Sequence, residues 1–275
     1  MFITAETFAE RGWAVPAFRA DTFSARTTRY VVVIPVLNEG QRIRSQLRRM
    51  HDLGISAEAD LAIVDGGSSD GSLEPGFLRS VGVRALLIKT GAGRLSAQLR
   101  CGYAWSLCEG YDGIVTIDGN DKDGVETIPS FLRALDDGYG YAQASRFIPG
   151  GHSANTPPLR LLAIRLFHAP MLSLAAGTWL TDTTQGYRAY SAAFLADPRT
   201  QPFRDIFMGY ELLAYLTVRA SQLEYRVIEL PTSRVYPSGG PVPTKINSFA
   251  AQLDLVHILL RTVLRHYHPD RDGAS

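Results

Sequence analysis

The fold is decided by the stretch Tyr30-Val-Val-Val-Ile-Pro-Val-Leu-Asn-Glu39, which opens with a β-branched run and ends in polar residues. A helical spacing of apolar residues follows at 43–50, and a second apolar run, 61–64, ends at Asp65. A third run, 113–117, ends at Asp118. Short apolar strands that alternate with helices are typical of a parallel sheet with helices on both faces. We therefore predict an α/β fold with a mixed, mainly parallel sheet.

The remaining segments extend this pattern and then lose its regularity. We expect a strand at 85–89 and a helix at 95–107. In the second half we expect strands at 141–147 and 227–231, helices at 207–220 and 246–265, one or two helices around Pro170 at 157–179, and a Gly/Pro loop at 237–243. The sequence has no internal repeat and no clear linker. We predict a single domain at 30–265, divided into halves at 30–123 and 124–265, with an N-terminal extension at 1–29 and a tail at 266–275.

Acidic side chains follow three of the predicted strands. Glu39, Asp65 and Asp118 each stand at or just beyond a carboxyl end. In open α/β sheets, ligands bind beyond the carboxyl ends of the strands. We expect these three carboxylates to share one cleft.

The overall charge is nearly balanced. The 275 residues include 28 Lys and Arg against 27 Asp and Glu, a formal net charge of +1. This balance excludes non-specific binding of nucleic acid through a broadly basic surface. Any cationic function must be local.

The longest apolar stretch, 159–180, is long enough to span a bilayer, but it contains Arg160, Arg165 and His168 and a proline. Such a segment is typical of a helix at a lipid interface, or equally of packed core helices. The first thirty residues mix charged and apolar side chains, unlike a signal peptide. We expect a cytoplasmic protein, with peripheral contact at the inner face of the membrane as an option.

Three motifs carry a family resemblance. They are 33–39 (Val-Ile-Pro-Val-Leu-Asn-Glu), 63–71 (Ile-Val-Asp-Gly-Gly-Ser-Ser-Asp-Gly) and 117–121 (Ile-Asp-Gly-Asn-Asp). In order and spacing they resemble the inverting nucleotide-sugar glycosyltransferases of family 2, which have the GT-A fold. The later segments 145–151, 182–188 and 229–231, followed by Arg234 and Lys245, look like the dolichol-phosphate mannose synthase branch.

The resemblance implies a role for each matching residue. The donor would be a GDP- or UDP-hexose. Pro35, Leu37 and Glu39 would border its base, and Asp65 would accept a hydrogen bond from the base. Asp118 and Asn120 would lie near the ribose and the metal, Gly119 would leave room for the donor, and the turn at Gly93 would bring backbone close to it. The acceptor phosphate and the donor diphosphate would be gathered by Arg146, Arg160, Arg234 and Lys245. Arg146 and Asp182 are the predicted catalytic residues.

Departures from the family pattern concern the metal and the base. The family's metal motif is Asp-x-Asp, often with a Gln two positions on, whereas this chain has Asp118, Asn120 and Lys122. A divalent cation prefers anionic oxygens, so we predict a retained but weaker Mg²⁺ or Mn²⁺ site at Asp118 and Asn120. The alternative is that Lys122 partly replaces the charge of the metal. Leu37 stands where the family often has an aromatic residue, which leaves the nucleobase open.

The acceptor separates two functions. A polyprenyl phosphate arrives with an anionic oxygen and needs cations, whereas a hydroxyl of a saccharide, nucleoside or natural product needs a base, for which Asp182 is the candidate. Asp182 could also serve only as a cap. A third, more remote alternative is a non-catalytic module that binds a nucleotide sugar.

Overall fold

The computed structural model describes residues 2–3, 5–236 and 249–269. Its centre is a nine-stranded sheet in the order β1-β2-β5-β4-β3-β6-β9-β7-β10. The strands are β1 Phe2–Ile3, β2 Phe18–Thr22, β3 Tyr30–Val36, β4 Asp60–Asp65, β5 Val83–Lys89, β6 Gly113–Thr116, β7 Tyr141–Ser145, β9 Arg188–Ser191 and β10 Val227–Pro231. A second, two-stranded sheet pairs β8 His152–Ala154 with β11 Ser233–Val235 in parallel.

The direction of the strands divides the sheet in two. Strands β5, β4, β3 and β6 run parallel, and β7 runs parallel to β10. Between them β9 is antiparallel to both neighbours, and β2 is antiparallel at the other end. The sheet is therefore mixed and mainly parallel, as predicted.

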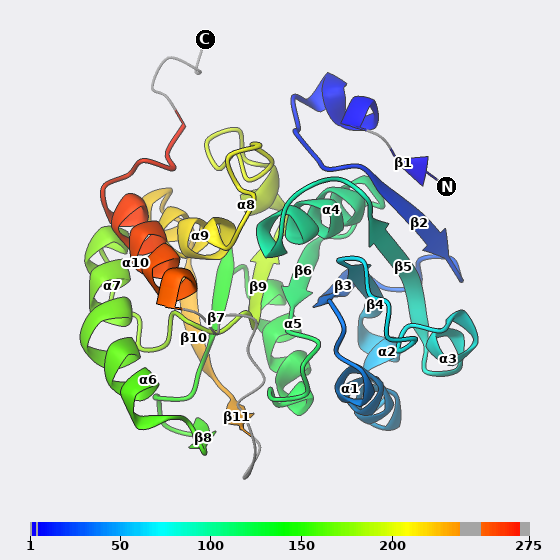
Figure 1. The fold of residues 1–275 in the computed structure, drawn as a ribbon, viewed down its shortest axis with the longest axis horizontal. Coiled ribbons are helices and arrows are strands. Elements are labelled where there is room, and N and C mark those ends of the chain that lie inside the picture. The colour runs from blue at the N-terminus through cyan, green and yellow to red at the C-terminus, as the bar shows by residue number, and fades with distance from the viewer. Residues whose placement is uncertain (1, 4, 237–248, 270–275) are drawn as a thin grey trace.

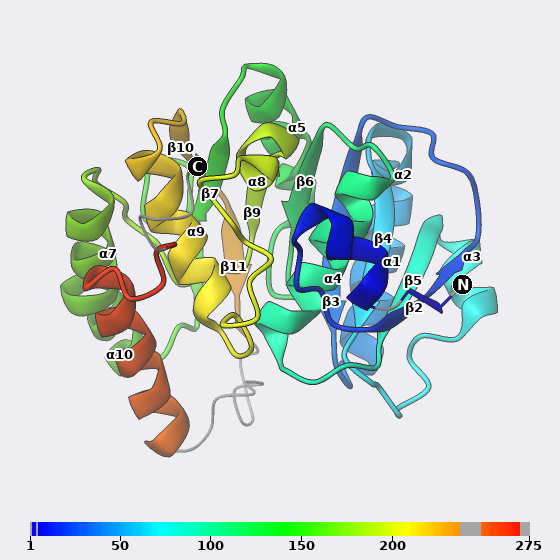
Figure 2. The same ribbon diagram turned by 90° about the horizontal axis from the view of Figure 1, so that it is seen from above.

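Helices cover both faces of the sheet (Figures 1 and 2). They are α1 Gln41–Asp52, α2 Ile55–Glu58, α3 Pro75–Ser80, α4 Leu95–Cys108, α5 Ile128–Asp136, α6 Pro158–Ala163, α7 Ala169–Ala176, α8 Ala192–Ala196, α9 Glu211–Gln222 and α10 Phe249–Val263, with short 3₁₀ turns η1 Ala5–Arg11 and η2 Val125–Thr127. Along β3, Val31 and Val33 pack into the core with α4, whereas Val32 and Ile34 pack into the core with α1 and α5. Because successive side chains of a strand point to opposite faces, a strand between two layers of helices must be apolar throughout.

The expected N-terminal extension is part of the sheet. β2 pairs with β5 over five residues, and β1 pairs with β2. Phe8, Val15 and Phe18 are buried in the same core as α4. The predicted N-terminal extension therefore adds β1 and β2 to the sheet beside β5, so the sheet continues beyond the predicted domain boundary at residue 30.

Of the one or two helices expected at 157–179, the structure has one continuous run, Pro158–Ala176, that includes Pro170. α6 runs into a π-helical turn, η3 Ile164–His168, and then into α7. Pro170 lies at the start of α7, where the π-turn already changes the backbone bonding and a missing N–H is tolerated. This run, Pro158–Ala176, is the one helix in the described part of the chain that is long and apolar enough to cross a membrane by length and composition.

Two further boundaries differ from the prediction. The helix expected at 207–220 begins at Glu211, because the carbonyls of Met208 and Gly209 accept from the N–H groups of Arg94 and Ser96 at the start of α4. In the expected tail, Tyr267 is buried. The predicted Gly/Pro loop 237–243 and the first residues of the last helix lie outside the described residues.

Candidate active site

The three strand-end carboxylates lie at one edge of the sheet. β3 stands between β4 and β6 in parallel register, with Val36 opposite Asp65. Glu39 follows β3, Asp65 ends β4, and Asp118 comes two residues after β6. The parallel order therefore places all three at the carboxyl edge, as the sequence predicts.

Asp65 shapes its own turn. Its Oδ1 accepts hydrogen bonds from the N–H groups of Gly67 (3.1 Å) and Ser68 (2.8 Å). The neighbouring loop is tied to this turn, since Asn38 donates its N–H to Ser68 Oγ and accepts from the N–H of Ser69. Asp65 thus forms the local Asx turn, which holds the loops after β3 and β4 together.

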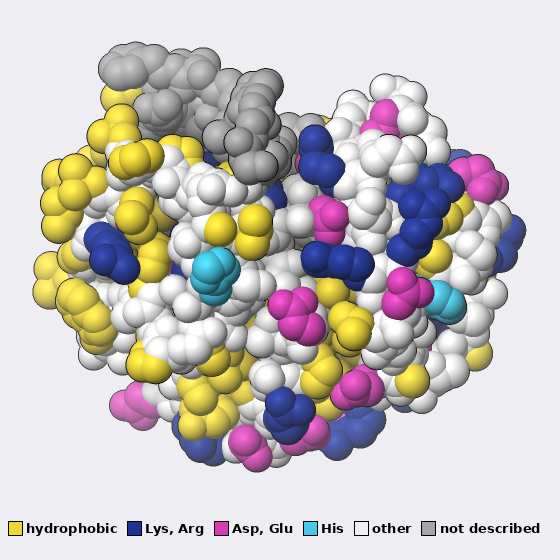
Figure 3. Space-filling view, turned by 90° about the horizontal axis from the view of Figure 1, so that it is seen from below, with side chains coloured by type: hydrophobic (Ala, Val, Ile, Leu, Met, Phe, Trp, Pro, Cys, Tyr) yellow, Lys and Arg dark blue, Asp and Glu magenta, His cyan; other side chains and the backbone are white. Residues whose placement is uncertain are grey.

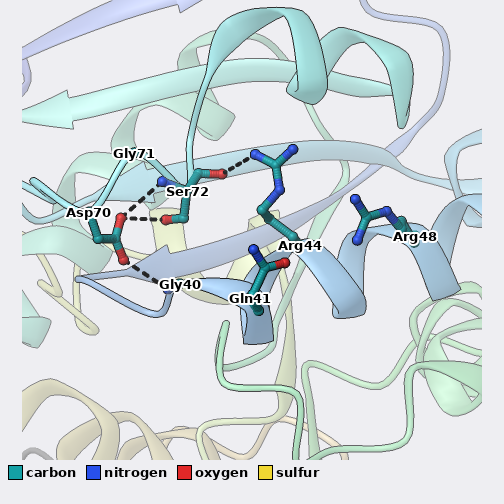
Figure 4. Close-up of a pocket in the computed structure, with 7 residues that line it drawn as sticks. All are labelled: Gly40, Gln41, Arg44, Arg48, Asp70, Gly71 and Ser72. Atoms are coloured by element: carbon teal, nitrogen blue, oxygen red, sulfur yellow. Dashed lines mark hydrogen bonds between the residues drawn. The ribbon is translucent and has the colours of Figure 1, made fainter.

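A polar hollow of about 250 Å³ opens beside these loops. It is lined by Gly40, Gln41, Arg44, Arg48, Asp70, Gly71 and Ser72 (Figure 4). Asp70 accepts from the N–H of Gly40 at 2.8 Å and from the hydroxyl of Ser72 at 2.7 Å. Burial raises the pKa of Asp70, but these hydrogen bonds outweigh it and the pKa is lowered. None of the predicted site residues lines this hollow. We therefore assign its lining residues the structural role of holding the loops after β3 and β4 together.

Asp118 meets a cation from the other half of the chain. Arg234 Nη2 lies 3.5 Å from Asp118 Oδ2, and Arg234 Nη1 lies 2.6 and 2.7 Å from the two carboxylate oxygens of Asp123. The Arg234 and Asp123 side chains are almost completely buried, with 6% and 0% of their surface exposed. Burial lowers the pKa of Arg234, yet the charges of Asp123 and Asp118 outweigh it and the pKa is raised. Arg234 therefore stays charged beside Asp118.

Two glycines control the approach to Asp118. A Cβ on Gly186 would lie 2.3 Å from Asp118 Oδ1, so only glycine allows this loop to pass the carboxylate. A Cβ on Gly119 would meet Val36 at 2.9 Å and the carbonyl of Pro35 at 3.2 Å. A side chain at Gly119 would thus collide with β3, and the role of this glycine toward a donor stays a prediction. At Gly93 the backbone approaches the carbonyl of Met208, and φ is +102°.

Arg146 and Asp182 form a forked ion pair. Arg146 Nε donates to Asp182 Oδ2 at 2.6 Å and Nη2 donates to Oδ1 at 3.0 Å, with side-chain exposures of 1% and 0%. Asp182 also accepts from Gln185 Nε2 at 2.7 Å and from the Thr184 hydroxyl at 3.2 Å. Burial raises the pKa of Asp182, but the bonds and charge of Arg146 outweigh it and the pKa is lowered. A carboxylate so engaged is poorly suited to take a proton from an acceptor.

Glu229 holds the backbone that carries this pair. Its carboxylate accepts from the N–H of Thr181 at 2.8 Å, from the N–H of Asp182 at 3.1 Å and from the Thr181 hydroxyl at 2.9 Å. Burial raises the pKa of Glu229. In contrast, Arg146 Nη1 is buried and has no hydrogen-bond acceptor within the described residues. One buried guanidinium donor of this pair is therefore left unpaired, which is unusual for a buried polar group.

The other predicted cations gather around Tyr236. Lys122 Nζ lies 5.2 Å from the centre of its ring, and Arg234 and Arg160 lie at 5.7 and 5.9 Å. Lys245 lies outside the described residues. Tyr236 was not among the predicted site residues, and its only signal was its place two residues after Arg234.

The donor set for a divalent ion is small. In the described part of the chain, no three His, Cys, Asp or Glu side chains are grouped so as to hold a metal ion. Asp118 offers a carboxylate and Asn120 a side-chain amide, whose Nδ2 donates to Asp118 Oδ2 at 3.4 Å and whose Oδ1 accepts from the N–H of Lys122 at 3.3 Å. One carboxylate and one amide fit a divalent ion that takes its remaining oxygens from a bound ligand.

Comparison with known proteins places the chain in a family. It is 30% identical over 212 residues to an undecaprenyl-phosphate mannosyltransferase of Micrococcus luteus, covering 75% of this chain and 84% of that protein. The chain belongs to the polyprenyl-phosphate glycosyltransferase branch of family 2. This glycosyltransferase is also 29% identical over 211 residues to a polyprenol monophosphomannose synthase of Mycolicibacterium smegmatis (74% and 77% covered). A dolichyl-phosphate hexose transferase of Haloferax volcanii is 28% identical over 219 residues (80% and 87%).

Solved structures support the fold of this glycosyltransferase. The glucosyl-3-phosphoglycerate synthase of Mycobacterium tuberculosis in complex with Mn²⁺, UDP and phosphoglyceric acid matches with a TM-score of 0.58 and 16% identity, covering 88% of this chain and 80% of that one. The same enzyme with phosphoglyceric acid alone matches with a TM-score of 0.59, also at 16% identity, over 88% and 81%. The neighbours are GT-A glycosyltransferases. No protein-family model matches the chain.

Proposed function

We propose that this enzyme transfers a hexose from a nucleotide-diphosphate sugar to a polyprenyl phosphate. The observation that carries the acceptor assignment is the closed ion pair of Asp182 with Arg146, which leaves no free carboxylate at the candidate base. A phosphate acceptor needs none, since its oxygen is anionic near neutral pH. The names of the curated relatives point to the same acceptor class.

In the proposed reaction, the acceptor phosphate oxygen attacks the anomeric carbon in line with the departing diphosphate. A carbon–oxygen bond to the acceptor forms, the bond to the diphosphate breaks, and the configuration inverts. The nucleoside diphosphate leaves with the bonding electron pair. Because charge accumulates on the diphosphate, the chemistry depends on cations placed beside it beforehand. Arg234, Arg160 and the unpaired Nη1 of Arg146 are proposed for this role.

The donor would lie along the carboxyl edge of the sheet. Glu39 and Asp65 stand at the base-binding loops, with Pro35 and Leu37 bordering them, and the turn at Gly93 opens α4. Asp118 and Asn120 are proposed to hold a divalent cation, which when bound would neutralise charge on the leaving diphosphate. Arg234 beside Asp118 competes for the same carboxylate, so we propose weak metal binding.

Contact with a membrane is proposed for the face formed by α6, η3 and α7. Its exposed apolar side chains are Leu159, Leu162, Leu166, Phe167 and Leu174, joined by Trp179 just beyond the end of α7, with exposed fractions from 52% to 81%. Figure 3 shows hydrophobic side chains gathered at the left of the molecule, the side on which Figure 1 draws α6 and α7. Gly177 and Trp179 also line an apolar hollow of about 350 Å³. A continuous apolar face on a helix is typical of helices that lie at a membrane interface. A lipid acceptor would therefore reach the site from the face formed by α6, η3 and α7.

A matched pair of acceptors tests the function. Purified protein with Mn²⁺ is given GDP- and UDP-hexoses together with either a polyprenyl phosphate or the corresponding polyprenol. We expect glycolipid with the phosphate and none with the alcohol. Equal transfer to the alcohol or to a soluble saccharide would overturn the acceptor assignment. Absence of transfer and of nucleoside diphosphate release from every donor would favour the non-catalytic module.

A flotation assay tests the membrane contact. The protein is mixed with liposomes that contain or lack anionic lipid and is centrifuged in a density gradient. We expect the wild-type protein to float and the Leu166→Ser/Phe167→Ser variant to remain at the bottom. Equal flotation of both would contradict the assignment of this face.

A further inference from the structure

Tyr236 is buried at the centre of three cations that come from distant parts of the chain. Its exposed fraction is 1%. Lys122 comes from the loop after β6, Arg160 from α6, and Arg234 from β11, and all three lie 5.2 to 5.9 Å from the ring centre. Distances of this size are within the range of cation–π contacts. The ring therefore lies where the donor half and the acceptor half meet.

The backbone holds the ring firmly in this place. The N–H of Tyr236 donates to the carbonyl of Ala154 at 3.1 Å, and its carbonyl accepts from Asn155 Nδ2 at 2.9 Å. The N–H of the preceding Val235 donates to the carbonyl of Lys122 at 2.9 Å. The β11 strand thus connects the loop after β6 to the segment before α6.

Three like charges would repel one another without compensation. Asp123 and Asp118 offset Arg234. Arg160 has no ion pair among the described residues, and its guanidinium lies over the ring of Tyr236. The negative face of an aromatic ring attracts cations, and more strongly where water is excluded. The ring therefore offsets part of the repulsion between the cations without neutralising their positive charge.

The pKa of the Tyr236 phenol indicates the electrostatic environment among the three cations. Burial raises the pKa of Tyr236, but the charges of Arg234 and Arg160 outweigh it and the pKa is lowered. Arg146 contributes in the same direction. A negative charge is therefore stabilised here, which is the property required of a phosphate site.

We propose that Tyr236 is a positioning residue whose ring gathers Lys122, Arg160 and Arg234 into one cradle for phosphate groups. The ligand class is a diphosphate or phosphomonoester anion. That these anions belong to a sugar donor and a lipid acceptor rests on the proposed function. The cradle itself requires only that phosphate binds where the three cations converge.

Inorganic pyrophosphate is the probe, because it needs neither donor nor acceptor. Its binding is measured by calorimetry with chelator present, at low and high salt, for the wild type, Tyr236→Phe and Tyr236→Leu. Because the ring face persists in phenylalanine, we expect affinity within about threefold of wild type for Tyr236→Phe and a loss of about tenfold or more for Tyr236→Leu. The salt dependence should also be weaker in Tyr236→Leu.

A control separates this role from simple packing. Tyr215 is another buried tyrosine, at 1% exposure, whose ring contacts Phe207 and the guanidinium of Arg204 instead of the three cations around Tyr236. Tyr215→Leu should lower the melting temperature but leave pyrophosphate affinity unchanged. The proposal is overturned if folded Tyr236→Leu binds pyrophosphate like wild type, if Tyr236→Phe loses as much as Tyr236→Leu, or if the wild type does not bind pyrophosphate.

Failure of the two proposals can be told apart. If the acceptor assay gives no glycolipid but the three variants bind pyrophosphate in the expected order, the cradle stands and the acceptor assignment falls. If glycolipid forms but Tyr236→Leu binds pyrophosphate as tightly as the wild type, the acceptor assignment stands and the proposed role of Tyr236 is wrong.

Discussion

The two halves of the molecule satisfy their polar groups in different ways. In the donor half, the carboxylates of Asp65 and Asp70 accept from backbone N–H groups of their own loops. In the acceptor half, Asp182 and Arg146 are paired across 36 residues, and Arg234 reaches back to Asp123 across 111. The donor site is therefore built from local turns, whereas the acceptor site depends on long-range ion pairs. A substitution in an ion pair of the acceptor site should therefore disturb more of the structure than a substitution in a turn of the donor site.

The largest effect is expected at Arg146. Arg146→Ala leaves the Asp182 carboxylate buried without its partner and removes a donor to phosphate, so we expect a loss of about 3–5 kcal/mol in the free energy of unfolding. Turnover should fall by at least about a hundredfold. Urea unfolding and the lipid-phosphate assay measure the two effects. Arg165→Ala, on an exposed arginine of η3 that lies over Phe147, is the control and should stay close to wild type.

A double variant separates folding from chemistry at this pair. Arg146→Met/Asp182→Leu replaces both charges by apolar groups, which should recover much of the lost stability. Because no guanidinium remains, turnover should stay low. Recovery of turnover together with stability would show that the pair only supports the fold.

The next effect compares two carboxylates of the donor half: Asp118, which Arg234 contacts from the acceptor half, and Asp65, which accepts from the backbone of its own turn. Asp118→Asn removes the charge that Arg234 faces and weakens a metal ligand, so we expect kcat/KM for the donor to fall by about a hundredfold. Asp65→Asn keeps an oxygen for the Asx turn, and we expect a loss of about tenfold or less. Steady-state kinetics with varied donor measures both. Equal losses would contradict the division into local and long-range sites.

The donor half could be predicted from sequence because its structure is local. The β3 and β4 runs, their polar ends and the turn at Asp65 are each contained in fewer than ten residues, and parallel order brings them to one edge. The acceptor half could not be predicted in the same way. No residue near Asp182 in the sequence indicates that Arg146 forms an ion pair with it, and no residue near Lys122 indicates its contact with the ring of Tyr236. Arg146 and Asp182 meet because β9 runs antiparallel beside β7, and Lys122 and Tyr236 meet because the backbone of β11 bonds to the loop after β6. Local sequence patterns do not encode either arrangement.

A smaller effect is expected from Lys122, which belongs to the donor half but lies beside Arg234. Burial lowers its pKa, and the charge of Arg234 acts in the same direction. An ammonium near Asp118 opposes a divalent cation, so Lys122→Met should lower the Mn²⁺ concentration for half-maximal activity by about fivefold. The KM for the donor should rise, since a phosphate contact is lost. Titration of activity with Mn²⁺ tests this, and an unchanged or higher Mn²⁺ requirement would show that Lys122 does not compete with the metal.

The smallest effect concerns pH and the π-turn of the acceptor half. His168 Nδ1 lies 2.7 Å from the Thr183 hydroxyl, and burial, helped by the charge of Arg188, lowers its pKa to about 4. Between that value and its ordinary value near 6.5, the unfolded chain binds a proton that the folded chain does not, so stability falls as pH falls through this window. We expect His168→Gln to remove up to about 2 kcal/mol of the difference in unfolding free energy between pH 8 and pH 4.5. Denaturant unfolding at several pH values measures it, with His51→Gln, on the exposed end of α1, as the control. If both variants keep the wild-type slope, burial of a neutral imidazole at His168 is not a source of acid sensitivity. The long-range ion pairs and His268, whose pKa burial also lowers to about 4, must then account for it.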